Sequence, residues 1–265
     1  MLRGEKPSFN KLVRIPVNGV ELEGALVVPP AARGIVLFAH GSGSSRHSPR
    51  NNFVAETLRA AGIGTLLMDL LTKQEDTIHQ TRFDIDLLSW RLERATQWLM
   101  EEPRAQWSPT GKPVAPCRTP EGRKPEQEAP AKAGPPVEGS LDIGYFGAST
   151  GAAAALNAAA TFGSSIGAVV SRGGRPDLAM AALGSVQAPT LLIVGALDDV
   201  VIELNRKAYE RLKTEKQLAI VPGATHLFEE PGTLQEVARL AAAWFRRHLG
   251  AQRAADRTVE RKASV

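Results

Sequence analysis

The hydrophobic and polar positions of the chain form short apolar runs that alternate with segments of helical periodicity. In residues 11–28, apolar and polar positions alternate in two runs that meet at Asn18-Gly19. Alternation with a period of two is typical of a strand with one buried face, and Asn-Gly is a strong signal for a tight turn. The pattern therefore predicts an antiparallel hairpin at the start of the fold.

Uninterrupted apolar runs follow, as expected for strands that are buried on both faces. We predict these strands within 34–43, 63–71, 141–146, 166–174, 188–199 and 216–226. Segments with helical spacing lie between them, and we predict helices in "NNFVAETLRAAG", "TRFDIDLLSWRLERATQWLMEEP", the alanine-rich stretch to about Thr161, "VIELNRKAYERLK" and "TLQEVARLAAAWFRRHL". Asn51 or Asn52 is the expected cap of the first helix. The inner face of the second is predicted at Phe83, Leu87, Leu88, Leu92, Trp98 and Leu99.

Strands that alternate with helices indicate an α/β fold. We expect a mostly parallel sheet with helices on both faces and the hairpin added at one edge. The 265 residues suit one large domain, which we place at residues 1–249. In such sheets, ligands bind at the carboxyl ends of the strands.

Two segments differ from this pattern. Residues 105–140 contain eight prolines and mixed charges with almost no aliphatic side chains, which predicts a disordered insertion. Cys117 lies inside it, and we interpret it as an incidental exposed thiol. Residues 250–265 are polar and carry two net positive charges, as in a frayed terminal tail.

The composition argues against several classes of protein. The content is 43% hydrophobic and 23% charged, which is ordinary for a globular protein, and no apolar run is long enough to span a bilayer. The first residues lack the apolar segment of a signal peptide, and a single cysteine cannot form an internal disulfide. We therefore predict a cytoplasmic protein. The net charge of +4 is not gathered on one element, so we expect neither nucleic acid nor a membrane as a partner. The oligomeric state stays open.

The stretch "GYFGASTGAAAAL" contains the pattern Gly147-x-Ser149-x-Gly151 between a predicted strand and a predicted helix. In this context the serine sits on a tight, strained turn that exposes its hydroxyl. The flanking glycines are needed where the strand and helix backbones pass too close for a side chain. The pattern predicts a nucleophile at Ser149, although a turn of small residues would look similar.

Two further side chains complete a catalytic arrangement. A serine nucleophile needs a base and an acid that orients it, in the chain order Ser, Asp or Glu, His. Asp198 and His226 follow Ser149 in that order, each just after a predicted strand. Asp199 is the rival acid, but the spacing Gly-x-x-Asp favours Asp198. The backbone N–H groups of Ser42 and Thr150 are the expected donors of an oxyanion hole.

The motifs "FAHGSGSSRHSPRN", "GYFGASTGAAAAL", "VVSRGGRPDLA", "LLIVGALDDVV" and "GATHLFEE" together make the chain resemble the α/β-hydrolase superfamily, and specifically its dienelactone hydrolase-like branch. The likeness covers about residues 11–249 without the proline-rich segment. It implies a compact enzyme with no helical lid between Val170 and Ala188. The best-known dienelactone hydrolases use cysteine in place of Ser149, so the resemblance does not extend to their particular lactone substrate. Some relatives of this kind are joined to phosphoribosyltransferase domains; we predict none in this sequence.

Several charged residues near the expected site have alternative interpretations. Arg46, His47 and Arg50 follow the oxyanion turn, where solvation is the default and substrate contact by Arg46 is an alternative. Arg172 or Arg175 could hold a substrate carboxylate through two parallel hydrogen bonds, and an ion pair with Asp177 or another acid is at least as good an interpretation for both. His40 is interpreted as a packed residue that supports the oxyanion turn.

No phosphate-binding loop, dinucleotide fingerprint or metal-ligand spacing is present in the sequence, so we expect neither a cofactor nor a metal. The predicted function is a serine hydrolase that cleaves small-molecule esters, lactones or thioesters through an acyl-enzyme on Ser149. The alternatives are an acyltransferase or a cofactor-free perhydrolase with the same triad, and a hydrolase-like binding module without catalysis.

Overall fold

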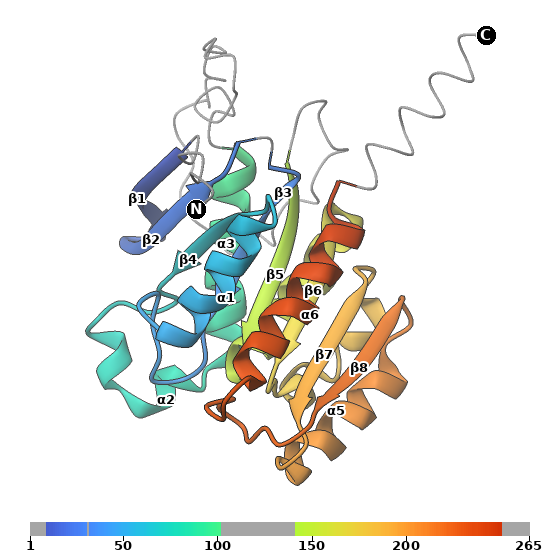
Figure 1. Ribbon diagram of the computed structural model, residues 1–265. Helices are drawn as coiled ribbons and strands as arrows, with labels where there is room; N and C mark the ends of the chain where they lie inside the picture. The colour runs from blue at the N-terminus through green and yellow to red at the C-terminus, as the bar shows by residue number, and fades with distance from the viewer. Residues whose placement is uncertain (1–8, 31, 102–140, 251–265) are drawn as a thin grey trace, which may run out of the picture.

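Eight strands form one sheet in a computed structural model that describes residues 9–30, 32–101 and 141–250 (Figure 1). The strand order is β1-β2-β4-β3-β5-β6-β7-β8. β2 pairs antiparallel with β1 and β4, and every other pairing is parallel. The strands are β1 Phe9–Val17, β2 Val20–Val28, β3 Gly34–Ala39, β4 Gly64–Met68, β5 Asp142–Ala148, β6 Ile166–Arg172, β7 Thr190–Gly195 and β8 Lys216–Val221. The predicted fold class, a mostly parallel sheet with an antiparallel hairpin at one edge, is confirmed.

The hairpin turns at the dipeptide that the sequence indicated. Val17 pairs with Val20, and Asn18 and Gly19 between them have φ values of 41° and 82°. Two successive positive φ values are the requirement of a type I′ turn, which matches the twist of the two strands that it joins. Asn and Gly are the residues that adopt this backbone at least cost, so the turn fixes the register of β1 on β2.

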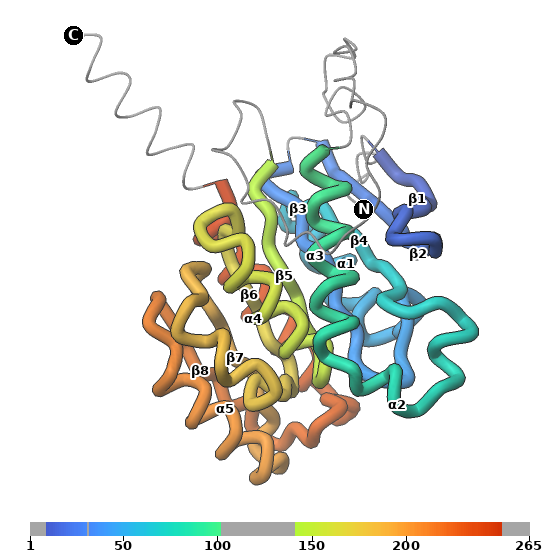
Figure 2. Tube along the Cα trace, turned by 180° about the vertical axis from the view of Figure 1, so that it is seen from behind, coloured from blue at the N-terminus to red at the C-terminus, as the bar shows by residue number. Residues whose placement is uncertain are grey.

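Helices cover both faces of the sheet. α1 (Pro49–Ala60) and α6 (Thr233–His248) lie on one face, and α3 (Ile85–Glu101), α4 (Thr150–Phe162) and α5 (Asp199–Arg211) lie on the other (Figures 1 and 2). The side chains of successive residues in β5 point to opposite faces of the sheet, as in any strand. Phe146 packs toward α1 and α6, with its ring 4.9 Å from that of Phe38. Tyr145 points to α3, where its hydroxyl lies 2.8 Å from Thr96 Oγ1 and is therefore not left unpaired.

Two local predictions are wrong. α1 is capped by Ser48, whose Oγ accepts from Asn51 N at 3.3 Å, and not by Asn51 or Asn52. Pro49 occupies the first helical position, where its fixed φ suits the helix and its missing N–H costs nothing. The second helix begins only at Ile85, after the short helix α2 (His79–Arg82). Phe83 precedes it and is 48% exposed rather than part of its inner face.

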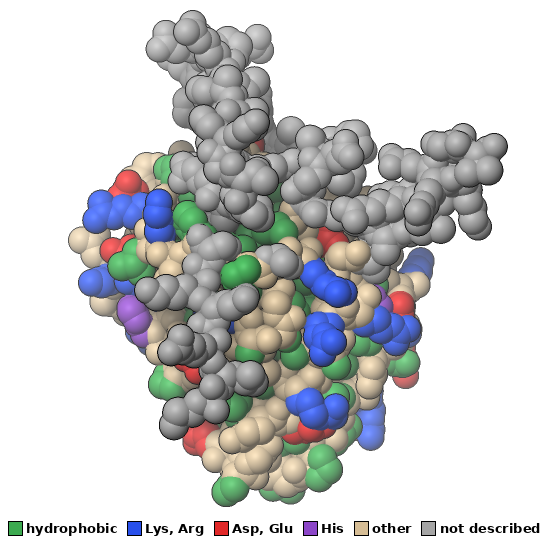
Figure 3. Space-filling view, turned by 45° about the horizontal axis from the view of Figure 1, so that its top comes forward, with side chains coloured by type: hydrophobic (Ala, Val, Ile, Leu, Met, Phe, Trp, Pro, Cys, Tyr) green, Lys and Arg blue, Asp and Glu red, His purple; other side chains and the backbone are tan. Residues whose placement is uncertain are grey.

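The proposed insertion at 105–140 and the tail beyond Gly250 lie outside the described residues. Figure 3 shows Lys and Arg side chains in several separate places on one face of the molecule, with acidic and neutral side chains between them. In the described part of the chain, no helix has the length and apolar character needed to cross a membrane.

Candidate active site

The candidate site lies at the edge of the sheet where the parallel strands end. Ser149 separates β5 from α4, Asp198 lies between β7 and α5, and His226 lies in the loop between β8 and α6. Parallel strands bring their carboxyl ends to one edge, so three residues far apart in the sequence come from neighbouring loops.

Ser149 occupies a strained turn. Its φ of 51° and ψ of −121° lie outside the regions that L-residues ordinarily adopt. Hydrogen bonds hold this backbone in place: Ser149 N donates to Arg172 O at 3.2 Å, and its carbonyl oxygen accepts from Ala152 N at 3.1 Å and Arg175 N at 3.0 Å. A conformation of this kind costs about 1–3 kcal/mol and persists only where the surroundings enforce it.

The two glycines of the motif are required by close backbone approach. A Cβ on Gly147 would lie 2.4 Å from Ala152 Cα, at the start of α4. A Cβ on Gly151 would lie 2.2 Å from the carbonyl oxygen of Ala39, at the end of β3. Both distances are far below a van der Waals contact with backbone atoms that cannot move aside. The strand, the helix and the neighbouring strand can therefore converge on Ser149 only if both positions are glycine.

The structure brings Asp198 and His226 together. Asp198 Oδ2 lies 2.6 Å from His226 Nδ1. Because an ionised carboxylate only accepts hydrogen bonds, Nδ1 carries the proton and Nε2 of a neutral ring is left with a free lone pair. Asp199, the rival acid, is exposed at the first position of α5. The two loops are joined by their backbones as well, since Leu197 N donates to Ala224 O at 2.9 Å.

Gly173 connects this pair with Ser149. The residue before it, Arg172, accepts the backbone N–H of Ser149. A Cβ on Gly173 would lie 3.5 Å from His226 Nδ1, so the histidine packs directly on this loop. Among the described residues, the Ser149 hydroxyl makes no hydrogen bond. Links of this kind are often long without substrate and tighten when it binds.

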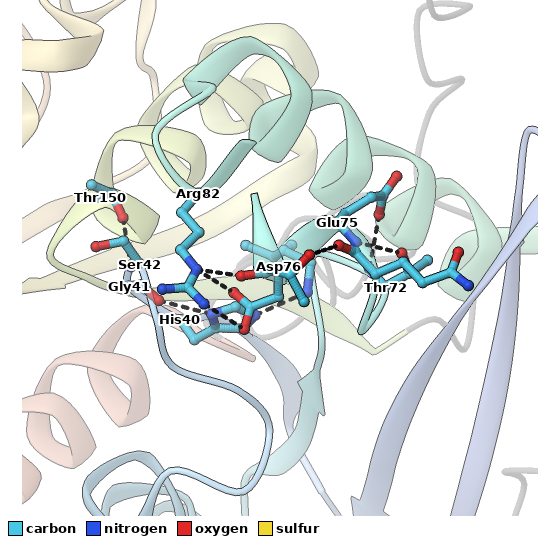
Figure 4. A network of polar contacts seen from close by, with 11 residues as sticks. His40, Gly41, Ser42, Thr72, Glu75, Asp76, Arg82 and Thr150 are labelled. Atoms are coloured by element: carbon cyan, nitrogen blue, oxygen red, sulfur yellow. Dashed lines mark hydrogen bonds and ion pairs between the residues drawn. The ribbon is translucent and has the colours of Figure 1, made fainter. Parts of the chain in front are cut away.

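The predicted oxyanion turn contacts α4, the helix that follows Ser149. Ser42 N donates to Thr150 Oγ1 at 3.0 Å (Figure 4). The contact ties the loop after β3 to the first residue of α4. It also aims the Ser42 N–H toward the residue whose own N–H is the second predicted donor.

His40 fixes the base of the same turn. Its Nδ1 lies 3.0 Å from Gly41 O, and its Nε2 accepts from Leu70 N at 3.0 Å, which spans from the end of β3 to the loop after β4 (Figure 4). Since Nε2 must accept, Nδ1 donates and the ring is neutral. Burial lowers the pKa of His40 and keeps it so. The side chain thus acts as a neutral bridge, in agreement with the packed role expected from the sequence.

Most of the charged candidates have carboxylate partners. Arg46 contacts both Asp69 and Glu23, the latter at 2.6 Å, so its guanidinium is already paired. Arg50 pairs with Glu229 at 2.6 Å. Arg175 binds Asp177 through two hydrogen bonds of 2.9 and 2.8 Å. Arg172 has no ion pair among the described residues, unlike Arg46 and Arg175, the other arginines suggested for substrate contact.

Two contributions near the site were not predicted. The segment around α2 reaches the oxyanion turn, where a Cβ on Gly43 would lie 3.8 Å from Arg82 Nη1. Arg82 in turn donates to Asp76 O at 2.5 Å (Figure 4). Asn205, fully buried in α5, donates to Gly174 O at 3.0 Å and so holds the loop after β6. In the sequence, the contact of Asn205 is indicated only by its position as a polar residue on the apolar stripe of a helix. No sequence feature indicates the contact of Arg82.

Comparison with known proteins identifies the family. The chain is 48% identical to a dienelactone hydrolase of Anabaena variabilis ATCC 29413, with a TM-score of 0.75 over 92% of this chain and 100% of that one. The chain belongs to the dienelactone hydrolase-like branch of the α/β-hydrolases. The esterase Est1E of Butyrivibrio proteoclasticus, at 14% identity and a TM-score of 0.66 over 89% of this chain and 98% of its own, shares the fold. The Pyrococcus furiosus esterase Pf2001 does so at 18% identity and a TM-score of 0.61, over 91% of this chain and 94% of its own. No protein-family model matches the chain.

Curated relatives of this chain carry a different name. Two Mycobacterium tuberculosis proteins, from strains CDC 1551 / Oshkosh and ATCC 25618 / H37Rv, are 49% identical over 245 residues and are both named "putative phosphoribosyl transferase". The match covers 92% of this chain and 48% of each relative. The chain therefore spans about half the length of the curated relatives that it matches.

Gly151→Ala tests the steric argument for the glycines that flank the turn at Ser149. The added methyl group meets the Ala39 carbonyl oxygen, and we expect overpacking to lower the free energy of unfolding by about 2 kcal/mol or more. Gly184→Ala is the matched control, because a Cβ there meets nothing within 4 Å. Urea denaturation of both variants measures the difference. Equal stability of the two would show that the turn at Ser149 tolerates a side chain at position 151.

His40→Gln tests the neutral bridge. Burial lowers the pKa of His40 in the folded protein. As the pH falls below about 6.5, the imidazole therefore takes up a proton in the unfolded chain but stays neutral in the folded one. The free energy of unfolding of the wild-type protein therefore decreases as the pH is lowered through this range. The variant has no titrating side chain at position 40, so its free energy of unfolding should decrease less. Urea denaturation at pH 7.5 and 5.5 measures both losses. An equal loss in the two proteins would contradict the assignment.

Proposed function

We propose that this protein is a serine hydrolase that cleaves carboxylic esters, lactones or thioesters of small molecules through an acyl-enzyme on Ser149. The observation that carries the proposal is the Asp198–His226 hydrogen bond of 2.6 Å in the loops that flank a strained, glycine-bounded serine. Membership of the dienelactone hydrolase-like branch supports hydrolytic chemistry, and the named esterases with the same fold support ester bonds as its target.

The reaction follows from the roles that these groups can take. Ser149 Oγ attacks the carbonyl carbon while His226 Nε2 accepts its proton, and Asp198 holds the imidazole and stabilises the positive charge that develops on it. The proton then passes from His226 to the leaving alcohol or thiol. Water, deprotonated by the same histidine, attacks the acyl-serine and releases the carboxylic acid together with free Ser149.

The N–H groups of Ser42 and Thr150 are proposed to stabilise the negative oxygen of the tetrahedral intermediates. The Ser42 N–H already donates to the hydroxyl of Thr150 in this structure. Hydrogen bonds to an ionised acceptor are roughly twice as strong as neutral ones, so the oxyanion can share or take over this donor as charge develops. A lost oxyanion donor typically lowers kcat by about 10²–10³-fold.

Covalent labelling with a fluorophosphonate probe tests the proposal. We expect one label, on the peptide that contains Ser149, and hydrolysis of a short-chain nitrophenyl ester by the same protein. Ser149→Ala should lose both, and Asp198→Asn should lower turnover by several orders of magnitude, because the imidazole loses its orientation. Asp199→Asn is the matched control, since Asp199 is exposed and Asp198 is the carboxylate that contacts His226.

The outcomes separate the alternatives. Folded wild-type protein that neither reacts with the probe nor cleaves the ester would contradict the proposal and favour a binding module. Formation of a methyl ester in place of the free acid, when methanol is added, would favour acyl transfer. Equal losses in the Asp198 and Asp199 variants would contradict the assigned triad.

A further inference from the structure

The oxyanion turn has a sequence with little rigidity of its own. Its residues 41–45 read Gly-Ser-Gly-Ser-Ser, a composition that behaves as a flexible chain when nothing holds it. Gly43 has a φ of 67°, and Ser44 N donates to Gly41 O at 3.1 Å within the turn. The direction of the Ser42 N–H must therefore depend on the contacts that hold the two ends of the turn.

His40 and Arg46 stand at these two ends, and two consecutive residues of the loop after β4 hold them. At one end, His40 Nε2 accepts from Leu70 N at 3.0 Å. At the other, Asp69 Oδ1 accepts from the backbone N–H of Arg46 at 2.7 Å, while Asp69 Oδ2 pairs with the Arg46 guanidinium. Asp69 and Leu70 together therefore fix both ends of the turn.

Arg46 makes further contacts that keep its end of the turn in place. Its side chain is 13% exposed, and Nη2 pairs with Glu23 Oε2 of β2 at 2.6 Å. Its carbonyl oxygen accepts from Asn52 Nδ2 of α1 at 2.9 Å. The residue is thus joined to β2, to the loop after β4 and to α1.

The loop after β4 is itself anchored on two sides. Asp69 N donates to Glu23 O of β2 at 2.9 Å. Farther along the loop, Glu75 accepts from Thr72 N at 2.8 Å (Figure 4) and from Arg91 Nη2 at 2.6 Å. The Arg91 side chain is buried in α3. A backbone bond to the sheet and an ion pair to a helix therefore make this loop a fixed support for the turn.

The turn lies directly against Ser149. A Cβ on Gly41 would lie 3.0 Å from Ser149 Cβ, and Ser42 N donates to Thr150 Oγ1 at 3.0 Å (Figure 4). A shift of the turn would therefore move the Ser42 N–H relative to the serine. Donors to an oxyanion act only at the right position, and a misplacement of about 1 Å can lower a rate by about 10²-fold.

We propose that Asp69 is a positioning residue for the reaction: its carboxylate holds the backbone N–H and the guanidinium of Arg46, and so keeps the Ser42 N–H aimed at the oxyanion. Arg46 then acts through its contact with Asp69 and not by touching the substrate. The effect on catalysis rests on the proposed function, but the effect on the order of the turn does not.

Ester hydrolysis by variants at position 69 tests the effect on catalysis. Asp69→Ala removes both contacts with Arg46 and should lower kcat by about 10–100-fold with KM nearly unchanged, because the contribution lost is made in the transition state. Asp69→Asn keeps an oxygen for the Arg46 N–H, so it should retain part of kcat and guards against a folding defect. Glu23→Gln is the matched control, since it removes a carboxylate from the same guanidinium but leaves the backbone N–H on Asp69. Its kcat should stay near that of the wild type.

Nuclear magnetic resonance tests the order of the turn without any use of activity. Backbone order parameters of residues 41–45, from nitrogen relaxation, should be near about 0.85 in the wild type and should fall toward about 0.6 in Asp69→Ala. Glu23→Gln should resemble the wild type. The amides of α4 should keep their order parameters in all variants, which separates a loosened turn from a general loss of folding.

The two measurements together decide the proposal. Unchanged order parameters in Asp69→Ala would overturn it, and so would a loosened turn with unchanged kcat. A raised KM with unchanged kcat would indicate substrate contact in this region and would also overturn it, as would an equal loss of kcat in Glu23→Gln. A turn that loosens in Asp69→Ala, in a protein whose wild type neither cleaves esters nor reacts with the fluorophosphonate probe, would support the role of Asp69 in ordering the turn and refute the hydrolase mechanism.

Discussion

The strained backbone of Ser149 depends on the two glycines that flank it. They leave room for β5, α4 and the end of β3 to meet at this residue. β5, α4 and the end of β3 come so close together at Gly147 and Gly151 that a Cβ at either position would clash with neighbouring backbone atoms. Tight convergence forces the serine onto a sharp turn, and the sharp turn lifts its hydroxyl clear of both strand and helix. The order of strands β3, β5 and β6 at the centre of the sheet then determines which loops can reach that hydroxyl.

The neighbouring loops hold the turn at Ser149 and bring Asp198 and His226 together. The loop after β6 holds the Ser149 N–H and packs on His226, and the loop after β7 presents Asp198 to the same ring. On the other side, His40 connects the oxyanion turn to the loop after β4 as a neutral ring that donates at one nitrogen and accepts at the other. Some of these connections, those to Ser149 N, Gly41 O and Leu70 N, also give backbone groups a hydrogen-bond partner. The same contacts therefore hold the loops together and place the residues of the proposed triad.

Elements with strong periodicity could be predicted from the sequence, and so could residues that follow directly from them. The Asn18-Gly19 turn and the runs of β3, β5 and β7 are local patterns, and the pairing of Asp198 with His226 follows from strand ends that meet at one edge. What depends on tertiary contacts could not be predicted. The ion pairs of Arg46 join it to residues 23 positions away along the chain in both directions, and nothing in its own segment indicates them. Ser48 as a helix cap and the exposure of Phe83 depend on where a helix begins, which is decided by one or two residues. The unpaired state of Arg172 can be recognised only once every nearby carboxylate has been placed.

The central claim is that Ser149 becomes acylated during turnover, and acid quench followed by mass spectrometry of the peptides measures this directly. Protein mixed with a short-chain ester and quenched within the first turnovers should carry the acyl mass on the peptide "GYFGASTGAAAAL", at Ser149. Ester cleavage with no acyl group on that peptide, or with the acyl group on another residue, would contradict the account.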